Sequence, residues 1–127
     1  MSDRPRILLV DDENALLQIL EDVLTEAGFA VTKAATGAAA LEILDAEISE
    51  IRGLITDIRL PAPSGWDLAR HGRSLLPELA VVYVTGDSAG DWSAEGVPNS
   101  VLVAKPFAPA QVVTAISSLL TVGGTGG

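Results

Sequence analysis

Five residues with chemically active side chains each stand where an apolar, strand-like stretch of the sequence ends. They are an adjacent pair of carboxylates, a third carboxylate, a hydroxyl and an ammonium: Asp11, Asp12, Asp57, Thr85 and Lys105. Oxygen ligands, in a chain with no cysteine and no suitably placed histidine, favour a hard cation, for which Mg²⁺ is the natural choice. Such a cation also accepts a phosphate oxygen, which the ammonium and the hydroxyl could help to bind.

The stretches that precede these residues have the length and composition of β-strands. The predicted strands are 7–10, 29–34, 54–56, 80–84 and 101–104. The first is an unbroken apolar run, as expected of a strand buried on both faces. The second alternates between its two faces, which is typical of an edge strand.

Segments with helical periodicity separate the predicted strands. They are a helix over 13–27, one capped by Thr36, one near 66–75, a short one around Trp92, and a last one that starts at Pro109. The residues predicted to face the core from the first helix are Leu16, Leu20, Val23 and Ala27. Those predicted to do so from the last helix are Val112, Ile116, Leu119 and Leu120. Gly28 is placed to end the first helix in the left-handed conformation.

Five strands alternating with helices predict a doubly wound α/β fold. Its five-stranded parallel sheet would have the flavodoxin-like order 2-1-3-4-5, with helices on both faces. Right-handed crossovers bring the carboxyl ends of all strands to one edge, where such sheets bind their ligands. Strands one and three are neighbours in this order, so the three carboxylates are expected to meet. Carboxylates that close repel one another unless a cation or a proton intervenes, which strengthens the Mg²⁺ prediction.

Each of the five residues also has an ordinary structural explanation when it is taken alone. Asp12 could cap the first helix, Asp57 or Thr85 could belong to a turn, and Lys105 could point into solvent. These explanations do not account for the position of all five at the carboxyl ends of strands. Their coincidence favours a common functional site.

Length and composition limit what else the chain could be. Its 127 residues fit one domain, predicted over 1–121, followed by a flexible glycine-rich tail at 122–127 and no output domain. The formal net charge of −9 argues against direct nucleic-acid binding, because phosphate contacts need clustered lysine and arginine. No apolar run is long enough to cross a membrane, and the N-terminus lacks the features of a signal peptide. Zero cysteines suit a cytoplasmic protein.

Nearly the whole chain resembles the receiver domain family of response regulators in two-component signalling. The residues that carry the resemblance are Asp11-Asp12, Asp57 with the following Pro61 and Gly65, Thr85, and Lys105-Pro106. It implies the doubly wound fold, Mg²⁺ dependence and a phospho-histidine donor, which is a sensor histidine kinase or a histidine phosphotransfer protein. The chain would be a stand-alone response regulator, a monomer or weak homodimer that signals to an unknown downstream protein. It would be a signalling protein rather than an enzyme, although it would catalyse its own phosphoryl transfer and slow autodephosphorylation.

The resemblance also implies a role for each site residue. Asp57 would be the nucleophile that accepts the phosphoryl group, and Thr85 and Lys105 would contact that group once it arrives. The Mg²⁺ ligands would be Asp11 (through water), Asp12, Asp57 and the backbone carbonyl of Arg59. The peptide bond before Pro106 would be cis.

Several residues depart from the family pattern or fall outside it. Leu102 stands three residues before the lysine, where many members carry a tyrosine or phenylalanine that rotates inward. Asp87 is placed to alter the access of water to the phosphoryl group. His71, the one histidine of the sequence, is expected on a helix away from the site. Trp66 is expected in ordinary packing, whereas Trp92 could pack or contact a partner.

Three other functions compete with this one. A Mg²⁺-dependent phosphatase that forms an aspartyl phosphate would favour a second aspartate two residues after Asp57, where this chain has Arg59. A flavin carrier would need a phosphate loop rich in serine, threonine and glycine after the first strand, where the carboxylates would repel the phosphate. A receiver fold that has lost phosphorylation and serves as a docking module stays open, because Leu102 replaces the usual aromatic residue.

Overall fold

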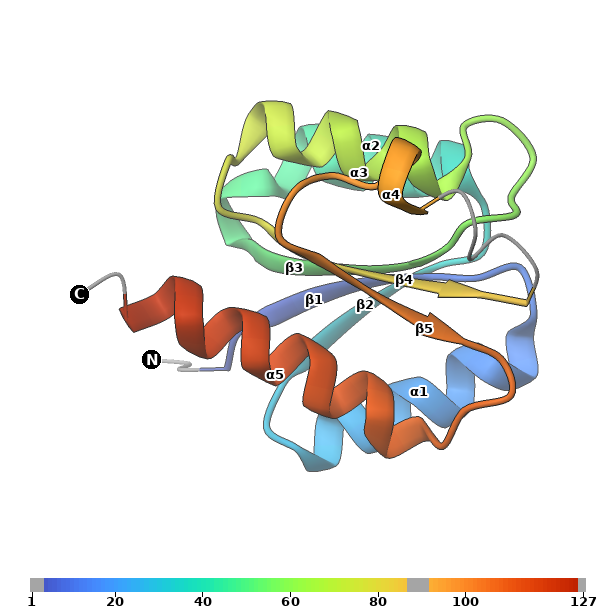
Figure 1. The fold of residues 1–127 in the computed structure, drawn as a ribbon, viewed down its shortest axis with the longest axis vertical. Coiled ribbons are helices and arrows are strands. Elements are labelled where there is room, and N and C mark those ends of the chain that lie inside the picture. Colours follow the sequence, from blue (N-terminus) through green and yellow to red (C-terminus); the bar gives the residue numbers. More distant parts are fainter. Residues whose placement is uncertain (1–3, 87–91, 126–127) are drawn as a thin grey trace.

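The computed structural model describes residues 4–86 and 92–125, which form a central sheet covered by helices on both faces (Figure 1). The strands are β1 (Arg6–Val10), β2 (Ala30–Ala34), β3 (Ile51–Asp57), β4 (Ala80–Thr85) and β5 (Ser100–Ala104). The helices are α1 (Asn14–Glu26), α2 (Gly37–Glu47), α3 (Gly65–Leu75), α4 (Trp92–Glu95) and α5 (Pro109–Thr125), with a 3-10 turn η1 (Ile48–Glu50) after α2. Each element predicted from the sequence is therefore present.

The five strands of the described residues are parallel and lie in the order β2-β1-β3-β4-β5, which confirms the predicted doubly wound sheet. Helices α1 and α5 cover one face, and α2, α3 and α4 lie on the other (Figure 1). The pairing register aligns the carboxyl ends of the central strands, because Val10 lies opposite Thr56 and Asp57 opposite Val84. Within the described residues, no helix combines the length and the hydropathy needed to span a membrane.

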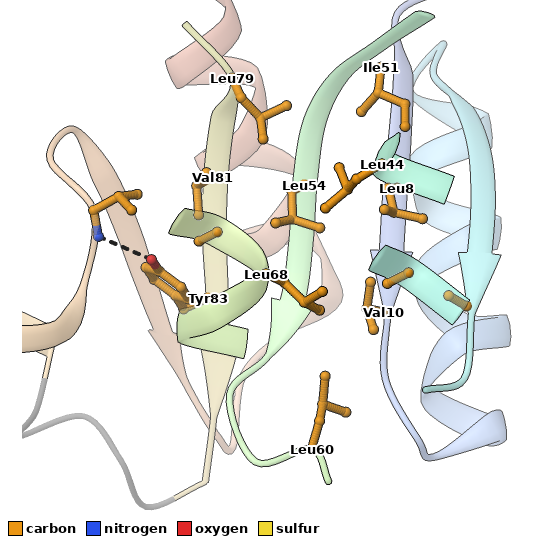
Figure 2. Packing of buried hydrophobic residues seen from close by; sticks show 14 of the residues in the cluster. Leu8, Val10, Leu44, Ile51, Leu54, Leu60, Leu68, Leu79, Val81 and Tyr83 are labelled. Atoms are coloured by element: carbon orange, nitrogen blue, oxygen red, sulfur yellow. Dashed lines mark hydrogen bonds between the residues drawn. The ribbon is translucent and has the colours of Figure 1, made fainter. Parts of the chain in front are cut away.

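Two apolar clusters, one on each face of the sheet, hold the helices in place. Side chains alternate along each strand, so Leu8 and Val10 point toward α2 and α3, while Ile7 and Leu9 point toward α1 and α5. Figure 2 shows the first cluster, in which the strand residues pack beneath Leu68 of α3 and its neighbours. Full burial of one such side chain stabilises the fold by about 1.5–3 kcal/mol relative to exposure.

Local sequence signals set the ends of the helices. Gly28 follows α1 with a φ of +100°, the left-handed conformation predicted for it. The Thr36 side chain caps α2 by accepting a hydrogen bond from the N–H of Ala39 at 3.0 Å. Ser64 and Asp67 form a reciprocal capping box at the start of α3, which the sequence reasoning did not identify.

The buried stripe of α1 differs from the prediction. Its buried residues are Leu17, Leu20 and Leu24. Leu20 is buried as predicted, and Leu16 and Val23 are half-buried and pack against the same core. The prediction was wrong for Ala27, which is exposed. Residues 15–17 and 19–20 are all apolar, so the sequence permits two stripes that differ by one position. Contacts with β2 and α5 select the second stripe.

The last helix is longer, and less buried near its end, than the sequence indicates. Val112 and Ile116 are entirely buried as predicted, but Leu119 and Leu120 are only half-buried. Figure 1 shows why, since the last turns of α5 run past the amino-terminal end of the strands. The helical backbone continues through 122–125, into the segment predicted as a flexible tail. Two glycines there favoured an earlier end, because each costs about 1 kcal/mol relative to alanine in a helix.

Strand β3 begins three residues before the predicted strand. Ile51 is entirely buried and pairs with Arg6 of β1, which makes it part of the sheet. The next two residues, Arg52 and Gly53, interrupt the apolar pattern, because Arg52 is exposed and glycine is depleted in strands. The sequence therefore shows the strand only from Leu54 onward.

Candidate functional site

The structure brings the three predicted carboxylates together at the carboxyl ends of β1 and β3. One carboxylate oxygen from each of Asp11, Asp12 and Asp57 lies within 4.8 Å of those of the other two. Asp11 and Asp57 are buried, and Asp12 is exposed at the mouth of the cluster. We call these three residues the acidic site.

Main-chain contacts fix the position of Asp57. Its Oδ1 accepts a hydrogen bond from the N–H of Arg59 at 3.2 Å. The next residue, Ile58, donates its N–H to Val84 of β4 at 3.3 Å and accepts one from Gly65 of α3 at 3.0 Å. A Cβ on Gly65 would lie only 2.3 Å from the carbonyl oxygen of Asp57. The absence of a side chain at Gly65 therefore lets the start of α3 approach the end of β3.

Asp11 is held in a similar way on the neighbouring strand. Its N–H donates to the carbonyl oxygen of Ala34 at 3.2 Å, and its Oδ1 accepts from the N–H of Glu13 at 2.8 Å. Both buried carboxylates thus accept a hydrogen bond from the residue two positions after them. The carboxylate positions follow from the path of the main chain.

The environment of the acidic site disfavours its full ionisation. Burial raises the pKa of Asp11 from its ordinary value of 3.8 to about 6, against the lowering effect of the Glu13 N–H, and repulsion by Asp57 adds to the rise. Burial also raises the pKa of Asp57, although the Arg59 N–H and the Lys105 ammonium act in the opposite direction. A divalent cation would reverse these effects, because it favours the charged form of every carboxylate near it.

The residues present fit a hard cation. The acidic site offers carboxylate oxygens from three residues in one cluster, and such oxygens are the ligands that Mg²⁺ prefers. The sequence has no cysteine, and its one histidine, His71, lies elsewhere. The ligand role of the Arg59 carbonyl stays a prediction, while the N–H of that residue orients Asp57.

Thr85 and Lys105 lie at the ends of the next two strands. Thr85 is entirely buried, and its carbonyl oxygen accepts a hydrogen bond from the N–H of Lys105 at 2.7 Å. The Lys105 ammonium acts on both buried carboxylates, since its charge lowers the pKa of Asp11 and of Asp57. The Lys105–Pro106 bond is cis, as predicted, and the Ala62–Pro63 bond is also cis.

One charged neighbour of the site was not predicted from the sequence. The Oε1 atom of Glu13 lies 3.9 Å from Nζ of Lys105, with the glutamate exposed and the lysine half-buried. A signal was present, because Glu13 extends the adjacent carboxylates Asp11 and Asp12 to a run of three acidic residues. Asp87, for which an effect on water access was predicted, lies outside the described residues.

The remaining residues singled out in the sequence have structural contacts. His71 lies on α3, away from the acidic site, with its Nε2 2.6 Å from Oδ1 of Asp45 near the end of α2. Trp66 packs against the ring of Tyr83, with ring centroids 4.7 Å apart, which confirms its packing role. Trp92 is 37% exposed and donates its indole N–H to Oγ of Ser100 at 2.9 Å.

The fold and the acidic site together define a class of protein: a doubly wound α/β domain with a cluster of carboxylates at the carboxyl ends of its central parallel strands. The response regulator receiver domain family matches residues 7–117 of the chain. The chain therefore belongs to this family, the receiver domains of two-component response regulators.

Two curated relatives show how the domain occurs in other proteins. The chain is 32% identical over 117 residues to the response regulator receiver protein CpdR of Brucella abortus, covering 91% of this chain and 96% of that protein. It is 33% identical over 115 residues to the C4-dicarboxylate transport transcriptional regulatory protein DctD of Rhizobium meliloti. That match covers 89% of this chain but only 25% of the relative.

Solved structures agree with this assignment. A response regulator receiver protein from Sinorhizobium medicae matches with a TM-score of 0.92 and 43% identity, over 95% of this chain and 98% of that one. The response regulator TrrA of Thermotoga maritima, in complex with Mg²⁺-BeF, matches with a TM-score of 0.78 and 26% identity. That match covers 91% of this chain and 99% of TrrA.

Proposed function

We propose that the chain is a stand-alone response regulator that accepts a phosphoryl group on Asp57 in a Mg²⁺-dependent reaction. The donor would be a sensor histidine kinase or a histidine phosphotransfer protein, and the signal would pass on by protein–protein interaction. The observation that carries this proposal is the convergence of the acidic site with Lys105 and Thr85 at one edge of the sheet.

The acidic site and the backbone carbonyl of Arg59 would hold the Mg²⁺ ion. When bound, Mg²⁺ supplies neutralisation of negative charge, so that an anionic phosphoryl group can approach an anionic nucleophile. The raised pKa values of Asp11 and Asp57 support this assignment, because they mark carboxylates whose charge is not yet compensated by the protein.

In the phosphoryl transfer, Asp57 acts as the nucleophile, and Lys105 and Thr85 contact the transferred group. A carboxylate oxygen of Asp57 attacks phosphorus, the phosphorus–nitrogen bond of the phospho-histidine breaks, and the imidazole leaves with the electron pair. Lys105 compensates the charge of the transferred group, and Thr85 donates its hydroxyl to one phosphoryl oxygen. Attack by water on phosphorus later breaks the bond between phosphorus and the Asp57 oxygen, which releases phosphate and a proton and restores the Asp57 carboxylate. Because the group that is modified belongs to the chain itself, we propose a signalling role rather than an enzymatic one.

The stand-alone form, the location and the partners are part of the proposal. The match over nearly the full length of CpdR supports the stand-alone form. The absence of cysteine is consistent with the reducing cytoplasm, where we place the protein. The net charge of −9 favours a protein partner over nucleic acid, and we propose a monomer or weak homodimer.

The test is intact-mass measurement after incubation with acetyl phosphate, with Mg²⁺ or with a chelator. We expect the wild type to gain one phosphoryl group only with Mg²⁺, and Asp57→Asn to gain none. Asp22→Asn, which removes an exposed carboxylate on α1, is the matched control and should behave as the wild type. A phosphoryl group on Asp57→Asn would show that the site is assigned to the wrong residue.

One observation favours a second candidate function, a docking module that does not depend on phosphorylation. Leu102 carries no aromatic ring, so the usual reporter of phosphorylation is missing from β5. A wild-type chain that binds Mg²⁺ but accepts no phosphoryl group from acetyl phosphate or from a histidine kinase would favour this second function.

A further inference from the structure

A buried tyrosine lies beside the position where the usual aromatic residue is missing. Tyr83 of β4 pairs directly with Leu102 of β5, so the two side chains share one face of the sheet. Both belong to the cluster on the side of α2 and α3, where Tyr83 is entirely buried and Leu102 is half-buried. In this region the aromatic ring therefore belongs to Tyr83 of β4 rather than to β5, and it is buried in the structure.

The hydroxyl of Tyr83 links β4 to the segment between α4 and β5. We call residues 96–99 the α4–β5 connection. The N–H of Val97 in this connection donates a hydrogen bond to the Tyr83 hydroxyl oxygen at 3.1 Å, which Figure 2 shows as a dashed line. Val97 is itself buried, so this bond is shielded from water.

Further side-chain bonds extend from Val97 to α4. The Ser100 hydroxyl donates to the carbonyl oxygen of Val97 at 2.6 Å. The same hydroxyl oxygen accepts the indole N–H of Trp92, the first residue of α4, at 2.9 Å. A displacement of Val97 would therefore reach the exposed surface of α4 through Ser100 and Trp92.

Tyr83 also stands next to the phosphorylation machinery. It precedes Thr85 by two residues on the same strand, so both side chains point to the same face of the sheet. Under the proposed function, Thr85 moves toward the phosphoryl group on Asp57, and the end of β4 moves with it. Tyr83 belongs to the same strand and its hydroxyl accepts the N–H of Val97, so such a movement would change the geometry of this bond.

We propose that Tyr83 is the positioning residue that couples the phosphorylation site to the α4–β5 connection, through the hydrogen bond that its hydroxyl accepts from Val97. The inference rests on the proposed function, because it needs the phosphoryl group to arrive at Asp57. It goes further by naming the residue that replaces an aromatic on β5 and the surface that responds. That surface is α4 with the α4–β5 connection.

The experiment compares the full chain with Tyr83→Phe, which removes one oxygen atom and keeps the ring. Labelling of Asp57 by acetyl phosphate should be unchanged, since within the described part of the chain the hydrogen bond and the ring contact of Tyr83 go to Val97 and Trp66 and not to the acidic site. In the resting state the Val97 amide should exchange with solvent about fivefold faster, the size expected for one lost neutral hydrogen bond. Loading with Mg²⁺ and beryllofluoride should shift the Val97 amide and the Trp92 indole signals in NMR spectra of the wild type. In Tyr83→Phe these two signals should stay where they are in the unloaded protein.

Trp66→Phe is the matched control, because it touches the same ring and leaves the Val97 bond intact. It should keep the wild-type response. A labelled Tyr83→Phe protein with the wild-type shifts at Val97 and Trp92 would overturn the coupling alone. A wild type that neither accepts a phosphoryl group nor binds beryllofluoride would overturn the proposed function and the coupling with it. If Tyr83→Phe does not fold, an unchanged Val97 amide in the loaded wild type overturns the coupling.

Discussion

Main-chain contacts hold the acidic site, whereas side-chain contacts hold the α4–β5 connection to the sheet and to α3. In the acidic site, the carboxylates of Asp11 and Asp57 accept main-chain N–H groups, and the strands beneath them are paired in register. In the α4–β5 connection, Gly96 donates its main-chain N–H to Trp92 of α4, while the bonds to β4, α3 and β5 come from the side chains of Tyr83, Arg73 and Ser100. The fold itself thus places the carboxylates, while particular residues place the connection.

Because of this difference, the chemistry at Asp57 and the readout through the α4–β5 connection should depend on different residues. A substitution on the surface cannot easily move main-chain N–H groups that belong to a paired sheet, so the chemistry at Asp57 should be robust. A single substitution can remove a side-chain bond in the connection and leave the acidic site unchanged. The site and its readout should therefore be separable by mutation, and the following changes test this in order of decreasing effect.

The largest effect is expected where the acidic site meets α3. In Gly65→Val, the Cβ would lie 2.3 Å from the carbonyl oxygen of Asp57, so β3 and α3 must separate. We expect a loss of about 2–3 kcal/mol in the free energy of unfolding, as for overpacked core positions, and a strong loss of labelling at Asp57. Urea unfolding and intact-mass measurement check both results.

Gly86→Ala is the matched control for this change. The nearest atom to its added Cβ would be Cδ of Lys105 at 3.9 Å, an ordinary contact distance. It should change the free energy of unfolding by less than about 1 kcal/mol. An equal loss in both variants would contradict the view that the close approach of α3 positions Asp57.

The second prediction concerns pH and the charge of Asp11. The folded chain holds the Asp11 proton up to a pKa of about 6, whereas the unfolded chain releases it near 3.8. The resulting stabilisation is fully present below the unfolded pKa and is lost as the pH rises through about 6. Without Mg²⁺, wild type should therefore lose up to about 3 kcal/mol relative to Asp11→Asn over this range.

Urea unfolding of both proteins between about pH 4 and pH 7.5 measures this difference. Saturating Mg²⁺ should reverse it at neutral pH, because the cation stabilises the ionised carboxylate and Asp11→Asn has lost one. A difference between the two proteins that stays constant across the pH range would show that Asp11 is already ionised in the folded chain.

The same contrast explains what the sequence could and could not predict. The acidic site was predictable because each carboxylate directly follows an apolar strand, and the strand order brings β1 and β3 together. The α4–β5 connection was not, because the partners of Arg73 there are carbonyl oxygens of Pro98 and Asn99, which every residue carries. A sequence therefore does not show which backbone carbonyl accepts a hydrogen bond.

Register and side-chain partners are the other information that the sequence lacked. The pairing of Tyr83 with Leu102 depends on how β4 and β5 align, and a shift of one residue would place Tyr83 on the opposite face. The buried stripe of α1 was predicted incompletely for a related reason. Several apolar residues follow one another there, so the sequence does not define which face is buried until the sheet and α5 select it. Sequence patterns therefore predicted the elements and their order better than the contacts between them.

The third prediction tests the side-chain contacts of the connection. Arg73 donates hydrogen bonds to the carbonyl oxygens of Leu79, Pro98 and Asn99 at 2.6–3.3 Å. In Arg73→Met these carbonyls lose a charged donor, and we expect a loss of about 1.5–3 kcal/mol in the free energy of unfolding. Labelling at Asp57 should be nearly unchanged, in contrast to Gly65→Val.

Arg52→Met, at an exposed position of β3, serves as the control for loss of one positive charge. It should change the free energy of unfolding by no more than about 0.5 kcal/mol. Equal destabilisation in the two variants would assign the effect to net charge rather than to the bonds of Arg73.

The smallest effect is expected for Glu13→Gln, which tests a side-chain ion pair beside the acidic site. Oε1 of Glu13 lies 3.9 Å from Nζ of Lys105, and the glutamate is 61% exposed, so the pair should contribute about 0–1 kcal/mol to stability. Its main effect should be on the approach of an anionic donor, because the change removes a negative charge and releases Lys105 toward the phosphoryl group.

We therefore expect Glu13→Gln to label about two- to fivefold faster with acetyl phosphate at low salt, and the advantage to shrink as salt screens the charges. Glu26→Gln, at an exposed position at the end of α1, provides the comparison with a carboxylate of equal charge elsewhere. A slower reaction in Glu13→Gln would mean that the glutamate holds Lys105 in its working position. The main chain would then not suffice to place the site, and the distinction between the acidic site and the α4–β5 connection would be weaker.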